Sequence, residues 1–305
     1  MQQNKYLTNL CKNLASGLFQ QSAKCSSAPE TTVQTRRKEI MARGLPKQRP
    51  IDGVKNIVLV SSGKGGVGKS TTAVNLATGL KLFHPEKRVG LLDTDIFGPT
   101  VPLMMNLRDT PFLSDKNLME PLVNYGVKCM SFGFLIEEGA PVIWRGLMVM
   151  QALEKLMRQV DWGTIDYLIV DTPPGTGDTH LSLVQNLPID GIVLVTTPQT
   201  AALQVTKRGA IMYNTLKIPI IGLFENMSAV TCPSCSSDIH IFGDGTQKLA
   251  KELKIDILGT VPLNGSISDS GDKGVPVVLD KNNQQSALYE TLAGKVVNFL
   301  ENKSV

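Results

Sequence analysis

The sequence predicts an α/β protein with a doubly wound, mostly parallel sheet, and three observations lead to that prediction. Short apolar runs alternate with longer helical patterns from Asn56 onward, which is typical of a parallel sheet covered by helices. The short runs are apolar throughout rather than alternating, as expected for strands buried on both faces. A glycine-rich segment joins the first run to the first helical pattern, and folds of this class bind phosphate at such a junction.

Six runs rich in Val, Ile and Leu are the expected strands, since each is short and apolar from end to end. They lie at residues 57–60, 89–92, 167–170, 191–195, 220–223 and 257–258. Five longer segments carry apolar residues at helical spacing, and they lie at residues 69–83, 146–160, 200–216, 246–253 and 286–300. No internal repeat and no interior linker rich in Gly, Pro or Ser interrupts this order. We therefore expect residues 38–305 to form one domain.

Size and composition are consistent with an α/β domain and argue against a membrane-spanning or disulfide-built protein. At 305 residues, of which 42% are hydrophobic, the chain is long enough to bury a sizeable core. It has no uninterrupted apolar run of about 18 residues, so no transmembrane segment is expected and any association with a membrane would be peripheral. Five Cys residues are too few for a disulfide-built secreted scaffold.

The formal net charge of +4 is unevenly distributed along the chain. Residues 1–50 hold nine basic and two acidic side chains, whereas the remaining 255 residues hold 22 basic and 25 acidic ones. A clustered basic excess is the usual sign of nucleic-acid binding. The body of the chain has no such excess, so nucleic acid is not an expected partner.

The first 29 residues contain no acidic side chain. Apolar residues from Tyr6 to Leu18 fall at helical spacing, and a Ser-rich run follows them. An amphipathic, Ser-containing, acid-poor leader is typical of a mitochondrial transit peptide. We therefore interpret residues 1–37 as a targeting leader and expect the protein in the mitochondrial matrix. Arginine, which such leaders usually contain, first occurs at Arg36, and a solvated disordered tail is the alternative.

The strongest motif follows the first expected strand and matches G-x-x-x-x-G-K-S/T in its required context, between a strand and a helix. It comprises Gly63, Lys64, Gly65, Gly66, Val67, Gly68, Lys69, Ser70 and Thr71. Its glycines let backbone N–H groups surround phosphates at a helix N-terminus. We expect Lys69 to neutralise the β and γ phosphates and the Ser70 hydroxyl to ligate Mg²⁺. ATP is expected rather than GTP, because no N-K-x-D guanine motif is visible.

A second lysine, Lys64, lies inside this loop. A lysine at that point has no phosphate left to contact in its own site. The motif resembles the deviant Walker A group, which includes the nitrogenase iron protein and the MinD/ParA ATPases. That resemblance implies that Lys64 reaches the nucleotide of a facing subunit, within a homodimer that sandwiches ATP. The alternative is a surface lysine that only raises the local potential.

Two acidic motifs accompany the phosphate loop. The second expected strand ends in Leu-Leu-Asp-Thr-Asp, and the resemblance to the deviant Walker A group places its last residue, Asp95, near the γ-phosphate, where it helps to orient water. The strand at 167–170 ends at Asp171, a Walker B pattern in which the carboxylate holds the Mg²⁺ shell. The Pro-Pro-Gly-Thr-Gly loop that follows resembles a switch that senses γ-phosphate. One strand-end Asp could merely cap a helix, but the order of the three motifs favours a phosphate site.

Cys232 and Cys235 form a C-x₂-C pair in a polar loop. A structural zinc site needs four ligands, and His240 is the one further candidate nearby. The pair is therefore half a site, and a homodimer would supply the other half by symmetry. Four thiolates suit a bridging 4Fe–4S cluster or a zinc ion. Thiol redox chemistry and an inert pair are the remaining alternatives.

Together these features resemble the Mrp/NBP35 family of P-loop iron–sulfur carriers, over roughly residues 38–300. Further likeness lies in residues 40–47, 144–150 and 158–163, and in the His-Ile-Phe-Gly sequence after the Cys pair. The resemblance implies a homodimer whose Cys232 and Cys235 hold a labile 4Fe–4S cluster, with ATP binding or weak ATP hydrolysis gating cluster assembly or release. It also places Asn226 and Pro262 near adenine.

One departure separates branches of that family. The cytosolic branch has a four-Cys motif near the N-terminus, whereas this chain offers only Cys11 and Cys25 there. Together with the leader, this favours the mitochondrial branch, which assists assembly of respiratory complex I. The implied recipients of the cluster are complex I subunits.

Three other functions remain as alternatives. A MinD/ParA-type positioning switch would need a basic amphipathic C-terminal helix to bind a membrane, and residues 286–305 carry two Glu against two Lys. A small-molecule kinase or ligase would use the same phosphate loop but would have no need of the Cys pair. A zinc-bridged P-loop dimer would use the pair without transferring a cluster.

Overall fold

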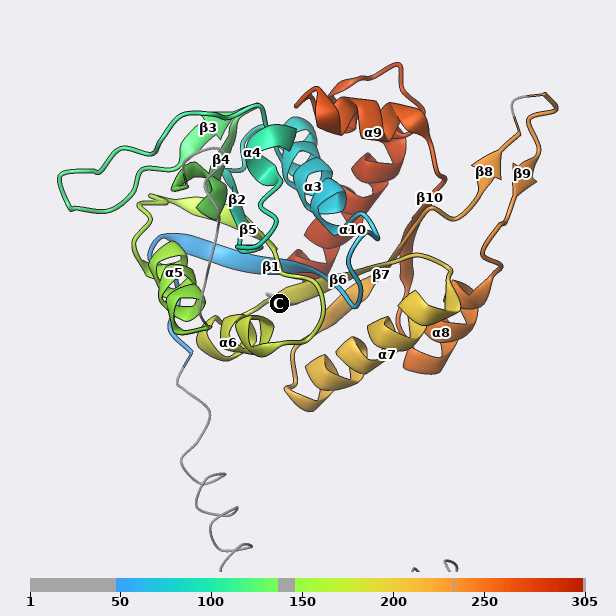
Figure 1. The fold of residues 1–305 in the computed structure, drawn as a ribbon, viewed down its shortest axis with the longest axis horizontal. Coiled ribbons are helices and arrows are strands. Elements are labelled where there is room, and N and C mark those ends of the chain that lie inside the picture. The colour runs from blue at the N-terminus through green and yellow to red at the C-terminus, as the bar shows by residue number, and fades with distance from the viewer. Residues whose placement is uncertain (1–47, 137–145, 233, 304–305) are drawn as a thin grey trace, which may run out of the picture. The chain divides into compact units, whose positions relative to one another are not determined.

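An eight-stranded sheet forms the centre of the computed structural model (Figure 1). The strand order is β10-β7-β6-β1-β5-β2-β4-β3, and all neighbours are parallel except β3 and β4. The eight strands are β1 (Val54–Ser62), β2 (Val89–Asp93), β3 (Leu122–Asn124), β4 (Val127–Ser131), β5 (Ile165–Asp171), β6 (Gly191–Thr196), β7 (Ile220–Asn226) and β10 (Ile257–Val261). This topology confirms the predicted doubly wound, mostly parallel α/β fold.

The structure describes residues 48–136, 146–232 and 234–303. The predicted leader at 1–37, with Cys11 and Cys25, lies outside the described residues. The family-like segment at 40–47 and the Trp144-Arg145 pair lie outside them as well. The leader and the domain boundary at residue 38 therefore stay predictions.

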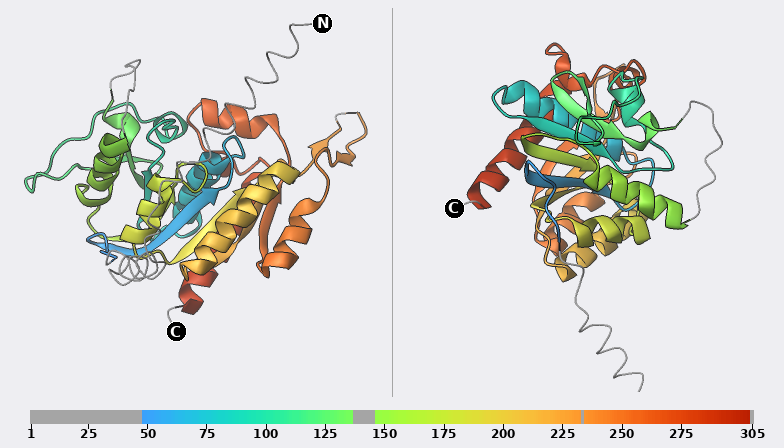
Figure 2. Two further views of the ribbon diagram at one scale, coloured as in Figure 1. Left: turned by 60° about the horizontal axis from the view of Figure 1, so that its bottom comes forward. Right: turned by 90° about the vertical axis from the view of Figure 1, so that its left-hand side faces the viewer.

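Helices cover both faces of the sheet (Figure 2). They are α3 (Lys69–Phe83), α4 (Val101–Met104), α5 (Gly146–Arg158), α6 (Asp178–Asn186), α7 (Thr200–Thr215), α8 (Gly245–Leu253), α9 (Gly265–Asp272) and α10 (Ser286–Lys303). In Figure 1, α3, α4, α9 and α10 lie above the sheet, and α5 to α8 lie below it. Two 3₁₀ turns, η1 (Phe132–Phe134) and η2 (Val277–Leu279), and a small hairpin of β8 (Val230–Thr231) and β9 (Asp238–Ile239) complete the described elements.

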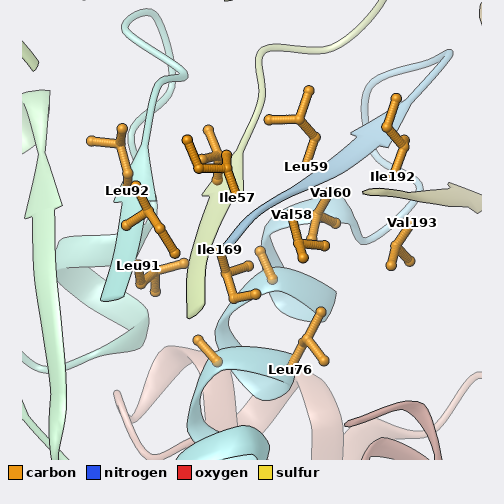
Figure 3. Close-up of a cluster of buried hydrophobic side chains, with 14 of the residues drawn as sticks. Ile57, Val58, Leu59, Val60, Leu76, Leu91, Leu92, Ile169, Ile192 and Val193 are labelled. Carbon is orange, nitrogen blue, oxygen red and sulfur yellow. The ribbon is translucent and has the colours of Figure 1, made fainter. Parts of the chain in front are cut away.

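The core lies on both faces of β1, which runs through the middle of the sheet (Figure 3). Val58, Leu59 and Val60 are fully buried in this strand. Leu76 of α3 packs over one face, where its side chain is fully buried. Because β1 is buried on both faces, it holds a fixed position, and its carboxyl end carries the glycine-rich loop.

The structure confirms all six expected strands and all five expected helices, with shifts at their ends. The helix expected at 69–83 has those limits, whereas the strand expected at 57–60 extends over Val54–Ser62. Five elements within the sheet and its helical layers were not predicted: β3, β4, α4, α6 and α9. They are short, and α6 and α9 are rich in polar residues, so hydrophobic periodicity gives them little signal. None of the described helices is both long and apolar enough to span a bilayer.

Gly53 provides a test of the turn that sets the start of β1. It has φ +77°, and a Cβ there would lie 1.7 Å from the carbonyl oxygen of Gly163. We expect Gly53→Ala to lower the free energy of unfolding by about 2 kcal/mol or more, because both the backbone conformation and the contact become unfavourable. Urea denaturation followed by circular dichroism measures the change.

Gly294 is the matched control, because it lies inside α10 and an added Cβ meets no atom within 4 Å. Gly294→Ala is expected to raise the free energy of unfolding by about 0.5–1 kcal/mol, since alanine favours a helix interior over glycine. Equal effects of the two substitutions would contradict this account of the turn.

Candidate functional site

The glycine-rich loop turns sharply between β1 and α3. Gly66 and Gly68 have φ of 80° and 87°, in the left-handed region that favours glycine. A Cβ on Gly68 would lie 2.1 Å from the side-chain nitrogen of Asn226. Among the described residues, no side chain caps the N-terminus of α3, which leaves the N–H groups of its first turn for phosphate oxygens.

Lys69 and Asp171 form a buried ion pair at the base of this loop. The Lys69 Nζ lies 2.6 Å from Asp171 Oδ1, and the two side chains are 7% and 0% exposed. The Lys69 ammonium also donates to the Ser70 hydroxyl over 3.2 Å. Burial raises the pKa of Asp171, and the charge of Lys69 opposes that effect. The ion pair therefore stabilises the charged form of a carboxylate that burial alone would disfavour.

The second carboxylate oxygen of Asp171 is buried and has no hydrogen-bond partner among the described residues. Buried polar atoms normally have partners, so this oxygen suits a ligand that the chain itself does not supply. Carboxylate and hydroxyl oxygens are the donors that Mg²⁺ prefers. The Asp171 oxygen and the nearby Ser70 hydroxyl therefore fit the predicted magnesium site.

Asp93, next to Asp171 in the sheet register, is a residue that sequence reasoning did not single out. Its carboxylate accepts hydrogen bonds from the Ser131 hydroxyl at 2.9 Å and from the backbone N–H of Asp95 at 3.0 Å. Burial, with the charge of Asp171, raises the pKa of Asp93 to about 7. Asp93 thus fixes the start of the loop that carries Asp95. Its position at the end of a buried strand was the available signal.

An open cleft of about 490 Å³ extends from the phosphate loop. The predicted site residues that line it are Lys64, Gly65, Gly66, Gly68, Lys69, Ser70, Thr71, Asp95, Asn226 and Pro262. The structure therefore brings residues of four separate segments to one cavity. Two predicted residues, Gly63 and Val67, belong to the loop but do not line the cleft.

Gly63 and Val67 support the loop instead. A Cβ on Gly63 would lie 2.6 Å from the backbone nitrogen of Thr206, so α7 packs directly against the loop. Val67 is buried, and its carbonyl accepts a hydrogen bond from the Asn226 side chain at 2.9 Å. Asn226 thereby ties the end of β7 to the phosphate loop.

The far end of the cleft is lined by residues that the sequence analysis did not identify. Several lie at helical spacing on or beside α9, and they are Asn264, Ile267, Ser268, Gly271 and Asp272. Met104 of α4 and Leu263, which follows Pro262, also line the cavity. A short polar helix has no clear hydrophobic periodicity, so this wall of the cleft could not be predicted from the sequence.

Lys64 has an exposed side chain at the rim of the cleft. The structure gives its ammonium group no hydrogen bond or ion pair with any described residue, whereas Lys69 is engaged with Asp171. The two lysines of one motif thus lie in different settings. Lys64 is accessible to a group outside its own chain.

The Cys pair lies on the β8–β9 hairpin, which projects beside β10 (Figure 1). The Cys232 backbone N–H donates to the Ser237 carbonyl at 2.9 Å, and the Ser236 N–H donates to the Cys232 carbonyl at the same distance. These bonds close a tight turn, with Pro233 outside the described residues. Both thiols are free, and Cys235 is exposed.

The Cys235 sulfur lies 3.0 Å from the Ser237 hydroxyl. That hydrogen bond, with further ones from the Ser237 backbone and from Cys232, lowers the pKa of the Cys235 thiol. A thiolate is the form of cysteine that binds metal. The hairpin thus offers a soft, accessible sulfur donor.

His240 does not complete a metal site with the pair. Its Nδ1 lies 3.1 Å from the Ser228 carbonyl oxygen. In the part of the chain that the structure describes, no three His, Cys, Asp or Glu residues are grouped to hold a metal ion. The Cys pair remains a two-ligand site within one chain.

Cys129, by contrast, is fully buried in β4, where burial raises the pKa of its thiol.

His180 is structural, as expected for a buried histidine. Its Nε2 is hydrogen-bonded to the Tyr213 hydroxyl, which lies 2.7 Å from the Ser61 hydroxyl. Burial lowers the pKa of His180 to about 4 and raises that of Tyr213. Both groups are therefore neutral at neutral pH, and they join α6, α7 and β1.

A ParA family model, described as NUBPL iron-transfer P-loop NTPase, matches residues 53–297, which include the phosphate loop and the Cys pair. A mouse protein named iron-sulfur cluster transfer protein NUBPL is 55% identical over 276 residues, covering 90% of this chain and 86% of its own length.

Two further matches are a plant protein and a solved structure. An Arabidopsis thaliana protein named iron-sulfur protein required for NADH dehydrogenase, mitochondrial, is 47% identical, covering 85% of this chain and 83% of its own length. The solved structure is a nucleotide-binding protein from Archaeoglobus fulgidus in complex with ADP. It is 33% identical, with a TM-score of 0.64, and the match covers 73% of this chain and 88% of that one.

The buried imidazole gives a prediction for the pH dependence of stability. The folded-state pKa of His180 lies below its usual value of 6.5, so the unfolded state takes up a proton first as the pH falls. We expect acidification from pH 6.5 to about 4 to cost the wild type up to about 3 kcal/mol more than His180→Gln. Urea unfolding at a series of pH values measures both; parallel curves would contradict the prediction.

Proposed function

The chain belongs to the ParA-type family of NUBPL iron-transfer P-loop NTPases, and from this premise we propose that it is an ATP-dependent iron–sulfur cluster scaffold and carrier. One observation carries the proposal: a single folded unit holds a cleft lined by the phosphate loop and a pair of free thiols, of which that of Cys235 is exposed. Nucleotide chemistry alone gives no use for the thiols. Metal binding alone gives no use for the buried Lys69–Asp171 pair.

In the proposed nucleotide site, ATP lies with its phosphates on the loop at 63–71 and its base between Asn226 and Pro262. Mg²⁺, held by Ser70 and Asp171, would neutralise phosphate charge. Lys69 binds the β and γ phosphates, and Asp95 orients the attacking water. The activity is a weak ATP hydrolysis that serves cluster transfer. The ADP bound by the Archaeoglobus relative supports a nucleotide in this cleft.

The proposed cargo is a 4Fe–4S cluster shared by two chains. Each chain supplies Cys232 and Cys235, and no third donor joins them among the described residues. A two-fold homodimer brings four thiolates together, which is the ligand number that such a cluster needs. The lowered pKa of the Cys235 thiol favours the ligating form.

The proposed recipients are subunits of respiratory complex I. The name of the Arabidopsis relative, which refers to mitochondrial NADH dehydrogenase, supports this assignment. The acid-poor leader supports a mitochondrial matrix location, with residues 1–37 as leader and 38–305 as the ATPase domain. Any contact with a membrane would be peripheral.

Two alternatives make different use of the same features. A MinD/ParA-type switch would need an exposed apolar helix face for the membrane. In α10 that face is buried in the core, through residues that include Tyr289, Leu292 and Val296. A zinc-bridged dimer would use the same thiols as the cluster, and metal analysis separates these two outcomes.

Iron content tests the cargo. After anaerobic reconstitution with iron and sulfide, we expect about four Fe per dimer, with the absorption of a 4Fe–4S cluster. Cys232→Ala and Cys235→Ala are each expected to lose most of it, because the shared site would keep only two thiolates. Cys129→Ala is the matched control and should retain the iron. Binding of one zinc per dimer with no uptake of iron would refute the cluster assignment.

Lys64 tests the role of the facing subunit. We expect Lys64→Ala to bind ADP normally but to hydrolyse ATP about a hundredfold more slowly, since a cation that acts on the transition state is lost. ATP-dependent dimerisation should weaken as well. Phosphate release and light scattering measure the two effects. Lys55→Ala, an exposed lysine at the other end of β1, is the control; unchanged hydrolysis in Lys64→Ala would leave only a surface role.

A further inference from the structure

The nucleotide cleft and the Cys hairpin share a short stretch of backbone. β7 ends at Asn226 and β8 begins at Val230, so three residues separate the strand from the hairpin. Asn226 and Met227 both line the cleft. The Asn226 side chain also donates to the Val67 carbonyl of the phosphate loop at 2.9 Å. The segment that leads into the hairpin therefore starts inside the nucleotide site.

A second segment of the cleft holds the same stretch. The Ser228 N–H donates to the Val261 carbonyl at 3.0 Å, and the Leu263 N–H donates to the Ala229 carbonyl at 2.8 Å. Pro262, between these two partners, lines the cleft. The base of the hairpin is thus hydrogen-bonded on both sides of Pro262. Because these two hydrogen bonds flank Pro262, a movement of the cleft wall at Pro262 would also move the base of the hairpin.

His240 joins the returning strand of the hairpin to this base. Val230 pairs with Ile239, and His240 follows directly. The Ser228 carbonyl oxygen lies 3.1 Å from His240 Nδ1. Because a carbonyl oxygen can only accept, Nδ1 carries a proton and donates this hydrogen bond. The side chain is exposed and belongs to no group of potential metal ligands among the described residues. Its observed partner is therefore the residue that lies between cleft and hairpin.

Met227, between the cleft and the hairpin, has an unusual backbone conformation. It has φ 55°, a left-handed conformation that is uncommon for residues other than glycine. Such backbone positions persist where the surrounding structure holds them, and they concentrate at binding and switch regions. Here the bonds of Asn226 and Ser228, one on either side, hold Met227 in that conformation.

We propose that Met227 is a hinge and that the His240–Ser228 hydrogen bond is the positioning contact through which nucleotide in the cleft sets the placement of the Cys pair. The inference rests on the proposed function, because it gives a structural route from ATP binding to cluster release. Nucleotide against Met227 and Pro262 restrains the hairpin base. Through His240 the restraint reaches both strands, and hence both Cys232 and Cys235. His240 acts on the cargo site through Ser228 and is no ligand of it.

Hydrogen–deuterium exchange of the full chain tests this link, with ADP and a non-hydrolysable ATP analogue as probes. Peptides over 62–71 report nucleotide binding, and peptides over 228–241 report the hairpin. We expect nucleotide to slow exchange in both regions of the wild type, by about tenfold in the hairpin. In His240→Ala the hairpin should lose this slowing while the phosphate loop keeps it.

Two further variants separate positioning from general destabilisation. His240→Gln should restore the effect of nucleotide on the hairpin, because the glutamine amide can donate to the Ser228 carbonyl. His84→Ala, which removes a histidine at the end of α3, should behave as the wild type. Unchanged nucleotide affinity in His240→Ala, measured by titration calorimetry, would show that the cleft itself is intact.

Each result of the exchange experiment either supports or refutes the link between the cleft and the hairpin. Nucleotide that protects the phosphate loop but not the wild-type hairpin would overturn the link, as would full hairpin protection in His240→Ala. Protection of neither region would refute nucleotide binding and so the proposed function. In that case the link is judged in the nucleotide-free protein: faster exchange over 261–267 in His240→Ala supports it, and unchanged exchange there refutes it.

Discussion

The buried ion pair between Lys69 and Asp171 is the constraint on which the rest of the site depends. Lys69 is the first residue of α3 and Asp171 the last of β5, so the pair fastens a helix to the sheet at the edge where the strands end. A buried charge without its partner costs several kcal/mol. Neither side chain can move independently, and the glycine-rich loop between β1 and α3 is therefore held in one shape. The Asp171 oxygen beside this pair that has no hydrogen-bond partner among the described residues is the one that the proposed Mg²⁺ would use.

The parts of the fold and site that could be predicted from the sequence are those that produce a pattern within one short segment of the chain. The buried parallel strands are recognisable because both of their faces are apolar, and the phosphate loop because its glycines and lysine stand at fixed spacing. The wall formed by α9 leaves no such trace, since none of its residues is buried. The edge of the sheet is similar: β3 has three residues and no fully buried side chain, so its strand character arises from pairing with β4.

Asp93 shows a different limit. The sequence presents two carboxylates at a strand end, Asp93 and Asp95, with Thr94 between them. Only the fold shows that Asp93 turns inward to Ser131 while Asp95 lines the cleft. The two roles depend on where β2 ends, since Asp93 is its last residue and Asp95 lies in the loop beyond it, and on what β4 places opposite Asp93. Neither property is local to the motif. The Cys pair is the reverse case, since its spacing is plain in the sequence, whereas its missing ligands would have to come from outside the described part of the chain, in which no third potential ligand is grouped with it.

The fold also sorts its three described cysteines by chemical reactivity. Cys129 is sealed in β4 with its thiol protonated, whereas Cys235 lies at the surface and its pKa is lowered. Oxidants and alkylating reagents attack the thiolate, so they reach the hairpin first and leave the core untouched. A preparation handled in air would therefore keep its fold while losing the exposed thiol of the hairpin. Folding assays would not detect that loss, and thiol titration of the native protein would.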